Sequence, residues 1–236
     1  MRELEPAGTA DLAAAYAYPD AGPWLRANMV ASADGAATQG GLTEGLGGPA
    51  DRRLLSTLRA LSDVVIVGGA TVRAEEYGPV RPREWWSDLR AGRTPAPPLA
   101  IVSRGLDFDF DAPVFAEALT PTIVITCESA PADRLRSCEK RAEVITVGGD
   151  RVEPGAALDA LAERGLVRQL TEGGPRLLAE FAAAGRLDEL CLTMSPLLTA
   201  GDAARVLNGP AMHPMPLRLG HVLEDDGFVF LRYVRG

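Results

Sequence analysis

Two glycine-rich turns in the sequence carry residue types that bind phosphate groups. One is Gly68-Gly69-Ala70-Thr71, which follows the apolar run 63–67, and the other is Gly173-Gly174-Pro175-Arg176-Leu177. Glycines let backbone N–H groups approach a ligand closely, and the N-terminus of a following helix carries partial positive charge. Both turns therefore point to a phosphate-bearing ligand, although a turn that binds nothing explains the first equally well.

Charged side chains follow two further expected strands. Ser103 ends the run 99–103 and Arg104 follows it, and a guanidinium is the preferred partner for two-point phosphate contact. This pair suits the 2′-phosphate that distinguishes NADPH from NADH. Asp34 belongs to the sequence Ser32-Ala33-Asp34-Gly35, in which another expected strand ends. The alternatives are a surface arginine at the first place and an ordinary Asp-Gly turn at the second.

Glu172 places a carboxylate directly before the Gly173-Gly174 turn. A carboxylate there can accept hydrogen bonds from substrate hydroxyls or ring nitrogens. The alternative is an acidic residue that merely favours the positive end of the following helix. We expect the ligand-binding role.

Strands and helices alternate along the chain and must position these residues. Short apolar runs predict strands, and runs that begin at proline or a polar residue predict helices between them. The alternation predicts an α/β fold with a mostly parallel central sheet and helices on both faces, and the apolar stretches 187–198 and 217–236 predict an antiparallel C-terminal edge. Ligands of such folds bind at the carboxyl ends of the strands, so we expect the turns to gather at one rim. The expected strands are 24–30, 63–67, 99–103, 122–126, 143–147, 168–171, 189–194 and 227–234, and the expected helices are 49–61, 71–76, 131–141, 154–164 and 175–184.

The charge balance argues against large anionic partners. The 236 residues include 24 Lys and Arg against 32 Asp and Glu, a net charge of −8. This balance disfavours nucleic acid or an anionic membrane as the main partner. A phosphate site must then be locally basic, and several arginines lie in or beside the turns: Arg59, Arg73, Arg81, Arg104 and Arg176.

The sparse cysteines and histidines argue against a metal site. Cys127, Cys138 and Cys191 have no metal-binding spacing, and only two histidines are present. We expect no metal, and buried thiols in a reducing compartment such as the cytoplasm. The N-terminus has no signal-peptide pattern, and no apolar run approaches the roughly 18 residues of a membrane span.

The ordered set of motifs resembles the riboflavin-biosynthesis pyrimidine reductase family. The matching stretches are 28–35, 58–73, 101–104, 171–178, 187–190 and 195–198, and the resemblance covers about residues 24–234. It implies a dihydrofolate-reductase-like fold, NADPH as the hydride donor and a homodimer. We expect one reductase domain over 1–236, with its core at 24–234 and an N-terminal extension at 1–23. The zinc deaminase motifs that precede this domain in many bacterial relatives are absent.

The resemblance also implies roles for particular residues. The cofactor contacts fall on the nicotinamide side at Ala31, on the short helix at Thr71 and Glu75, on the adenosine side at Ser103 and Arg104, and on the pyrophosphate at Gly173, Gly174, Pro175, Arg176 and Leu177. Substrate contacts fall on Arg59, Arg81 and Glu172. Glu75 and Asp34 are the catalytic candidates, as carboxylates that stabilise a protonated imine.

The implied reaction reduces the ribosyl side chain of 5-amino-6-(5-phosphoribosylamino)uracil to the ribityl product. Two departures from the family pattern affect the substrate end: Glu75-Glu76-Tyr77-Gly78-Pro79 replaces an Asp-Asp-Pro motif, and the loop 43–48 has no tryptophan. Dihydrofolate or a diaminopyrimidine ribosyl phosphate is therefore an alternative substrate. A non-catalytic NADPH-binding dimer is the alternative from another functional class. The proline-rich stretch 77–98 is expected to be a long loop, and its role stays open.

Overall fold

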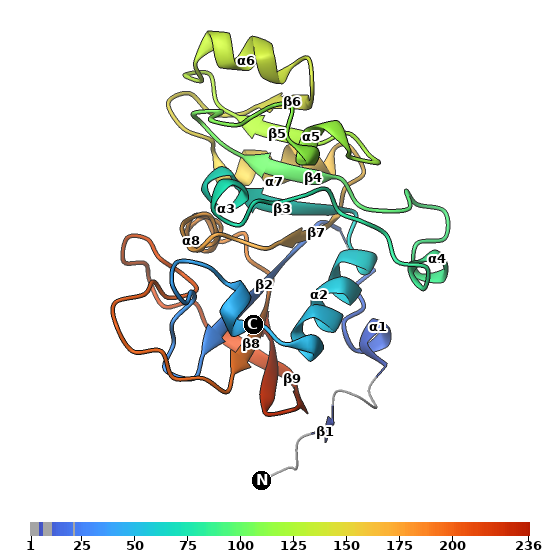
Figure 1. Ribbon diagram of the computed structural model, residues 1–236, viewed down its shortest axis with the longest axis vertical. Coiled ribbons are helices and arrows are strands. Elements are labelled where there is room, and N and C mark those ends of the chain that lie inside the picture. The colour runs from blue at the N-terminus through green and yellow to red at the C-terminus, as the bar shows by residue number, and fades with distance from the viewer. Residues whose placement is uncertain (1–4, 7–10, 21) are drawn as a thin grey trace. The chain divides into compact units, whose positions relative to one another are not determined.

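The computed structural model describes residues 5–6, 11–20 and 22–236, so the extension expected at 1–23 lies partly outside the described residues. The chain divides into two compact units. Figure 1 labels most of their helices and strands. Unit 1 comprises residues 1–58 and 171–236, and unit 2 comprises residues 59–170. The expectation of a single reductase domain stays a prediction.

Unit 1 contains the antiparallel C-terminal strands. Its strand order is β1-β9-β10-β8-β2, from β1 (Glu5–Pro6), β2 (Trp24–Ser32), β8 (Glu189–Ser195), β9 (Leu217–Asp225) and β10 (Phe228–Arg235). β2 runs parallel to β8, whereas β10 is antiparallel to both β8 and β9. Its helices are α1 (Leu12–Ala15), the 3-10 turn η1 (Glu44–Leu46), most of α2 (Pro49–Leu61) and α8 (Pro175–Ala183).

Unit 2 contains the parallel strands. Its strand order is β7-β3-β4-β5-β6, and β3 to β6 are parallel throughout. Val64 to Val67 and Ile123 to Thr126 are buried at every position, as expected where both faces of a sheet are covered. The strands are β3 (Val64–Gly68), β4 (Leu99–Val102), β5 (Ile123–Thr126), β6 (Glu143–Thr146) and β7 (Arg168–Thr171), and the helices are α3 (Gly69–Ala74), α4 (Trp86–Leu89), α5 (Pro113–Ala116), α6 (Ala132–Cys138) and α7 (Pro154–Ala162).

The α/β fold with mostly parallel strands and an antiparallel C-terminal edge is confirmed. The expected helix 49–61 coincides with α2, and the remaining expected helices agree with α3, α6, α7 and α8 to within a few residues. The proline at the start of α7 and of α8 is tolerated because the first helical N–H has no partner inside the helix.

The stretch 77–98 is mostly a loop, as expected, but it contains the short helix α4, and two of its arginines are anchored. Arg90, 4 % exposed, donates to the carbonyl oxygens of Ala60 and Ser62 at 3.0 and 2.6 Å. Arg93 donates to the carbonyls of Leu61 and Ser62 at 2.9 and 3.1 Å. These carbonyls lie at the C-terminal end of α2, where the last turn leaves acceptors unpaired and a positive charge is favourable. The stretch therefore caps a helix.

Candidate functional site

Within unit 1, the end of β2 carries Ala31, Ser32 and Asp34. Ala31 is buried at 4 % exposure, and Asp34 is exposed in the turn that follows. The Ser32 hydroxyl donates to Asp34 Oδ1 at 2.5 Å and accepts from the Ala36 N–H at 2.9 Å. The turn after β2 is thus held by side-chain hydrogen bonds as well as by the glycine at position 35, whose φ is +94°.

Asp34 also accepts hydrogen bonds from the chain that follows β8. Its donors there are the backbone N–H groups of Thr199 and Ala200 and the Thr199 hydroxyl. The Ser32 hydroxyl first, and then these backbone groups, lower the pKa of Asp34 to about 2. Asp34 is therefore an anion at neutral pH, which suits charge stabilisation and not proton donation.

The turn before α8 is closely packed against β2. Gly173 has φ +85°, and a Cβ there would lie 3.2 Å from Met29 Sδ. The Thr171 hydroxyl accepts the Gly173 N–H at 3.2 Å, and Gly174 is the N-cap of α8. Only glycine combines this left-handed backbone with the approach to Met29.

The start of α8 fits an anionic group. Because Pro175 has no N–H, the backbone donors of the first turn come from Gly174, Arg176 and Leu177. Arg176 is exposed, whereas Leu177 is 8 % exposed and packs into the core. Glu172 lies half-buried directly before the turn. Unit 1 thus holds Ala31, Asp34 and the whole expected pyrophosphate turn.

Within unit 2, the β3–α3 turn packs against the end of β4. A Cβ at Gly69 would lie 3.0 Å from Ser103 Cβ and 2.9 Å from Phe108 Cζ. Ser103 Oγ accepts the Leu106 N–H at 3.1 Å. Close packing therefore explains Gly69, and the structure brings together two of the loops that the sequence singled out.

The other expected cofactor residues of unit 2 are at the surface or half-buried. Thr71 lies in α3 and Glu75 is its C-cap, and both are half-buried. Arg104 is exposed after Ser103. Its guanidinium is thus accessible to a ligand from solvent.

The two arginines expected at the substrate phosphate differ in their surroundings. The Arg59 guanidinium lies 6.0 Å from the centre of the Tyr77 ring, a cation–π contact. Arg81 forms an ion pair with Glu117, and their side chains are 52 % and 56 % exposed. Surface ion pairs of this kind contribute at most about 1 kcal/mol, so Arg81 can exchange Glu117 for a phosphate at little cost.

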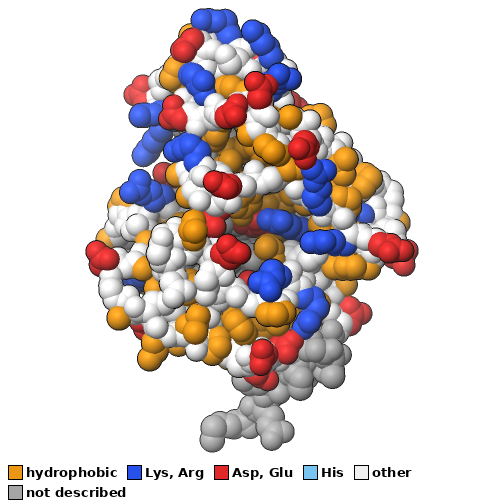
Figure 2. All heavy atoms as spheres, viewed as in Figure 1, with side chains coloured by type: hydrophobic (Ala, Val, Ile, Leu, Met, Phe, Trp, Pro, Cys, Tyr) orange, Lys and Arg blue, Asp and Glu red, His pale blue; other side chains and the backbone are white. Residues whose placement is uncertain are grey.

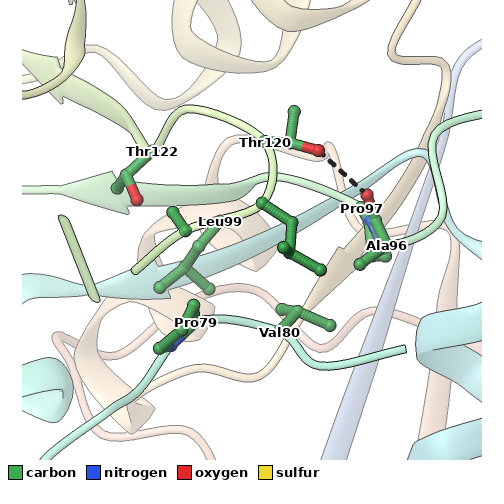
Figure 3. A pocket seen from close by; sticks show the side chains of 9 residues that line it. Pro79, Val80, Ala96, Pro97, Leu99, Thr120 and Thr122 are labelled. Carbon is green, nitrogen blue, oxygen red and sulfur yellow. Dashed lines mark hydrogen bonds between the residues drawn. The ribbon is translucent and has the colours of Figure 1, made fainter. Parts of the chain in front are cut away.

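A small hollow lies near Arg81 but is not a substrate pocket. Figure 3 shows it between Pro79, Val80, Ala96, Pro97 and Leu99, with the Thr120 hydroxyl donating to the Ala96 carbonyl at 3.3 Å. Its volume of about 10 Å³ has room for about one water molecule. It is therefore too small to hold a substrate.

A buried charged cluster in unit 1 was missed by the sequence reasoning. Glu189 and Arg26, both fully buried, are joined through Oε1 and Nε at 2.7 Å, and Arg232 Nε lies 2.8 Å from the same oxygen. The Trp24 indole N–H donates to Glu189 at 3.0 Å. The signal in the sequence was a charged residue in each of two mainly apolar strands, Arg26 in β2 and Glu189 in β8.

The described residues have mixed surface charge (Figure 2) and helices of limited apolar length. Acidic and basic side chains are interspersed over the face in Figure 2. The three cysteines are free and buried. None of the helices in the described ranges is long and apolar enough to cross a bilayer.

Comparisons with known proteins agree with this architecture. A protein from Archaeoglobus fulgidus, named 2,5-diamino-6-ribosylamino-4(3H)-pyrimidinone 5′-phosphate reductase, is 29 % identical over 79 % of this chain and 87 % of its own. A protein of the same name from Methanothermobacter thermautotrophicus is 31 % identical over 78 % of this chain and 83 % of its own. A crystal structure of a pyrimidine reductase-like protein from Corynebacterium diphtheriae superposes with a TM-score of 0.82 and 29 % identity, covering 91 % of this chain and 92 % of that one.

The family model described as the RibD C-terminal domain matches residues 23–229, which contain every residue that the sequence assigned to a site. The match also spans the strands of both units, from β2 to the start of β10. This chain therefore belongs to the RibD C-terminal domain family.

Proposed function

We propose that this chain is an NADPH-dependent reductase of riboflavin biosynthesis that converts the ribosyl side chain of a phosphorylated ribosylaminopyrimidine to a ribityl chain. The observation that carries the proposal is the similarity to proteins named as pyrimidine reductases along about four fifths of the chain. The glycine turn at 173–174 and the backbone N–H groups at the start of α8, which have no partner inside the helix, support it because they suit a pyrophosphate.

The proposed cofactor contacts follow from this assignment. The backbone of Gly173, Gly174, Pro175, Arg176 and Leu177 holds the pyrophosphate. Ser103 and Arg104 hold the adenosine end with its 2′-phosphate, Thr71 and Glu75 contact the cofactor at α3, and Ala31 lies at the nicotinamide end. NADPH, when bound, supplies the hydride that reduces the substrate.

The proposed substrate contacts are ionic and polar. Arg59 and Arg81 bind the 5′-phosphate, and Arg81 exchanges Glu117 for it. Glu172 accepts hydrogen bonds from the pyrimidine edge or the ribose hydroxyls. The ribose opens to an imine at C1′, and the carboxylate of Glu75 stabilises the positive charge of the protonated imine. These residues need no metal ion or covalent nucleophile.

Two substrates fit the proposal. The family resemblance implies 5-amino-6-(5-phosphoribosylamino)uracil, whereas both archaeal relatives are named for the 2,5-diamino-pyrimidinone compound. Turnover of each compound with NADPH, followed at 340 nm, decides between them. Reduction of dihydrofolate in place of both would contradict the substrate class, and NADPH binding without turnover of any pyrimidine or pterin would favour a binding protein.

The Arg81→Ala variant tests the phosphate contact. We expect the KM for the pyrimidine substrate to rise about tenfold, because one charged hydrogen bond to phosphate is lost, while the Kd for NADPH stays nearly constant. The control is Glu117→Gln, which frees Arg81 without removing it and should leave the KM equal or lower. A weaker NADPH affinity in Arg81→Ala would assign Arg81 to the cofactor instead.

We also propose that the protein is a cytoplasmic homodimer. Cross-strand neighbours place Leu192, Met194, Val229, Leu231 and Val222 on one face of the unit 1 sheet, and all of them are only half-buried. Glu224, which lies opposite Val229, adds one acidic side chain to this face. A half-exposed, mainly apolar sheet face of this kind is typical of a protein–protein interface. The buried free thiols are typical of a reducing compartment.

The Leu231→Arg variant tests the homodimer. We expect sedimentation velocity to show a dimer for the wild type and a monomer for this variant, because an unpaired charge would be buried in the interface. The matched control is Ala116→Arg, at an exposed position of α5. A monomeric wild type, or a dimer in Leu231→Arg, would contradict the proposed interface.

A further inference from the structure

Residues 196–216, which connect β8 to β9 and are here named the β8–β9 segment, are attached to the end of β2. The Ala33 N–H donates to the Leu197 carbonyl at 2.8 Å, and the Ala37 N–H donates to the Ala204 carbonyl at 2.8 Å. The first half of this segment is thus fixed to the chain that follows Ala31, on both sides of Asp34.

The second half of the same segment is attached to α8. The Asn208 N–H donates to the carbonyl of Pro175, the first residue of that helix, at 3.1 Å. A Cβ at Gly209 would lie 2.8 Å from Ala179 Cβ, so the segment and the helix are in close contact there. The β8–β9 segment therefore contacts both the end of β2 and α8, which carry the proposed cofactor contacts of unit 1.

Among the residues that attach the β8–β9 segment, Asp34 accepts the most hydrogen bonds. It accepts the Ala200 N–H at 2.7 Å, the Thr199 N–H at 3.2 Å and the Thr199 hydroxyl at 3.3 Å, besides the Ser32 hydroxyl. Three of these hydrogen bonds end on Oδ1, whereas Oδ2 accepts the Ala200 N–H and lies 3.3 Å from the Thr199 nitrogen. Ala200 adopts φ +53°, an unusual backbone angle for a residue with a Cβ.

We propose that Asp34 is a positioning residue for cofactor binding: it fixes the β8–β9 segment, and the segment holds the end of β2 and the start of α8 in their binding arrangement. This inference rests on the proposed NADPH-dependent function. It assigns Asp34 to the attachment of this segment and not to the reacting atoms, because its described hydrogen bonds all come from Ser32, Thr199 and Ala200.

Trypsin cleavage at Arg205 tests the attachment without any ligand. Arg205 is exposed and is the single Lys or Arg between Arg186 and Arg218, so cleavage within the segment reports on that residue alone. In Asp34→Asn we expect the peptide bond after Arg205 to be cut about three- to tenfold faster than in wild type, measured by mass spectrometry, because the segment opens more often.

The matched control is Asp202→Asn, the same chemical change in the same segment. Asp202 is exposed and accepts no hydrogen bond from the described part of the chain. Gly209→Ala is the second variant, because its methyl group forces the segment away from Ala179 and should also speed cleavage. Unchanged cleavage in both Asp34→Asn and Gly209→Ala would overturn the proposal.

Kinetics of the folded Asp34→Asn enzyme separate positioning from catalysis. Positioning predicts a KM for NADPH raised about three- to tenfold, with kcat within about twofold of wild type and an unchanged pH profile between pH 5 and 9. A large fall in kcat at saturating NADPH with unchanged KM would make Asp34 catalytic and overturn the proposal. If the wild type turns over no substrate, the proposed function is wrong. The proteolysis still tests whether Asp34 fixes the β8–β9 segment.

Discussion

Glu189→Gln is expected to lower the free energy of unfolding by about 3–5 kcal/mol, because it removes the negative charge from a buried cluster and leaves arginine unpaired. Glu189 is fully buried and accepts hydrogen bonds from Arg26, Arg232 and the Trp24 indole. Arg26 is itself fully buried, so its charge gains little from water. Urea unfolding of wild type and variant measures the loss as a lower midpoint.

The same cluster makes this difference depend on pH. Burial raises the pKa of Glu189, but the charges and hydrogen bonds of Arg26 and Arg232 lower it by more than burial raises it. The pKa of Glu189 is therefore below its usual range. A carboxyl with a lowered pKa in the folded state stabilises the protein above its unfolded pKa of about 4.3 and loses that contribution as the pH falls further. The difference between wild type and Glu189→Gln should therefore be full at pH 7 and shrink below about pH 4.

Glu143→Gln is the control for Glu189→Gln. Glu143 pairs with Arg164 at the surface, where the side chains are 51 % and 39 % exposed. Because such pairs contribute at most about 1 kcal/mol, this variant should unfold near the wild-type midpoint. Equal midpoints for Glu189→Gln and wild type at pH 7 would mean that the buried cluster contributes no net stability.

The cluster also bears on how far the sequence could predict this fold. Strands over 24–30 and 189–194 were predicted from apolar residues, and the structure contains both. The pairing of these strands could not be predicted from the sequence. Arg26 and Glu189 are 163 positions apart and meet only when β2 and β8 align in register. A local pattern predicts an element from its own residues, but it carries no information on its distant partner.

In the candidate site, too, local patterns could be predicted and distant contacts could not. Gly69 was equally compatible with phosphate binding and with a plain turn, and its contact with Ser103 and Phe108 supplies a packing reason that no local pattern contains. The arginine caps in 77–98 were missed because Arg90 and Arg93 bind backbone carbonyls near position 60. Carbonyls occur at every residue, so residue types and spacing cannot identify such partners.

Arg104→Ala is expected to weaken NADPH binding about tenfold to a hundredfold while NADH binding changes by less than about twofold. The reason is that the guanidinium is proposed to bind the 2′-phosphate, which only NADPH carries, and a charge-assisted pair of hydrogen bonds contributes roughly this much. Arg104 is exposed directly after Ser103, so its removal leaves no cavity in the core and should not unfold the protein. Titration of intrinsic fluorescence with each dinucleotide measures both Kd values.

Two further variants show whether the effect of Arg104→Ala comes from the lost phosphate contact or from the loss of a positive charge in general. Arg136→Ala removes a charge from an exposed position of α6 and should leave the ratio of the two affinities unchanged. Arg104→Lys keeps the charge but cannot form the two-point contact, so its ratio should lie between those of wild type and Arg104→Ala. If Arg104→Ala weakened NADPH and NADH equally, the residue would act on a part common to both dinucleotides, and the preference for NADPH would have to come from other side chains.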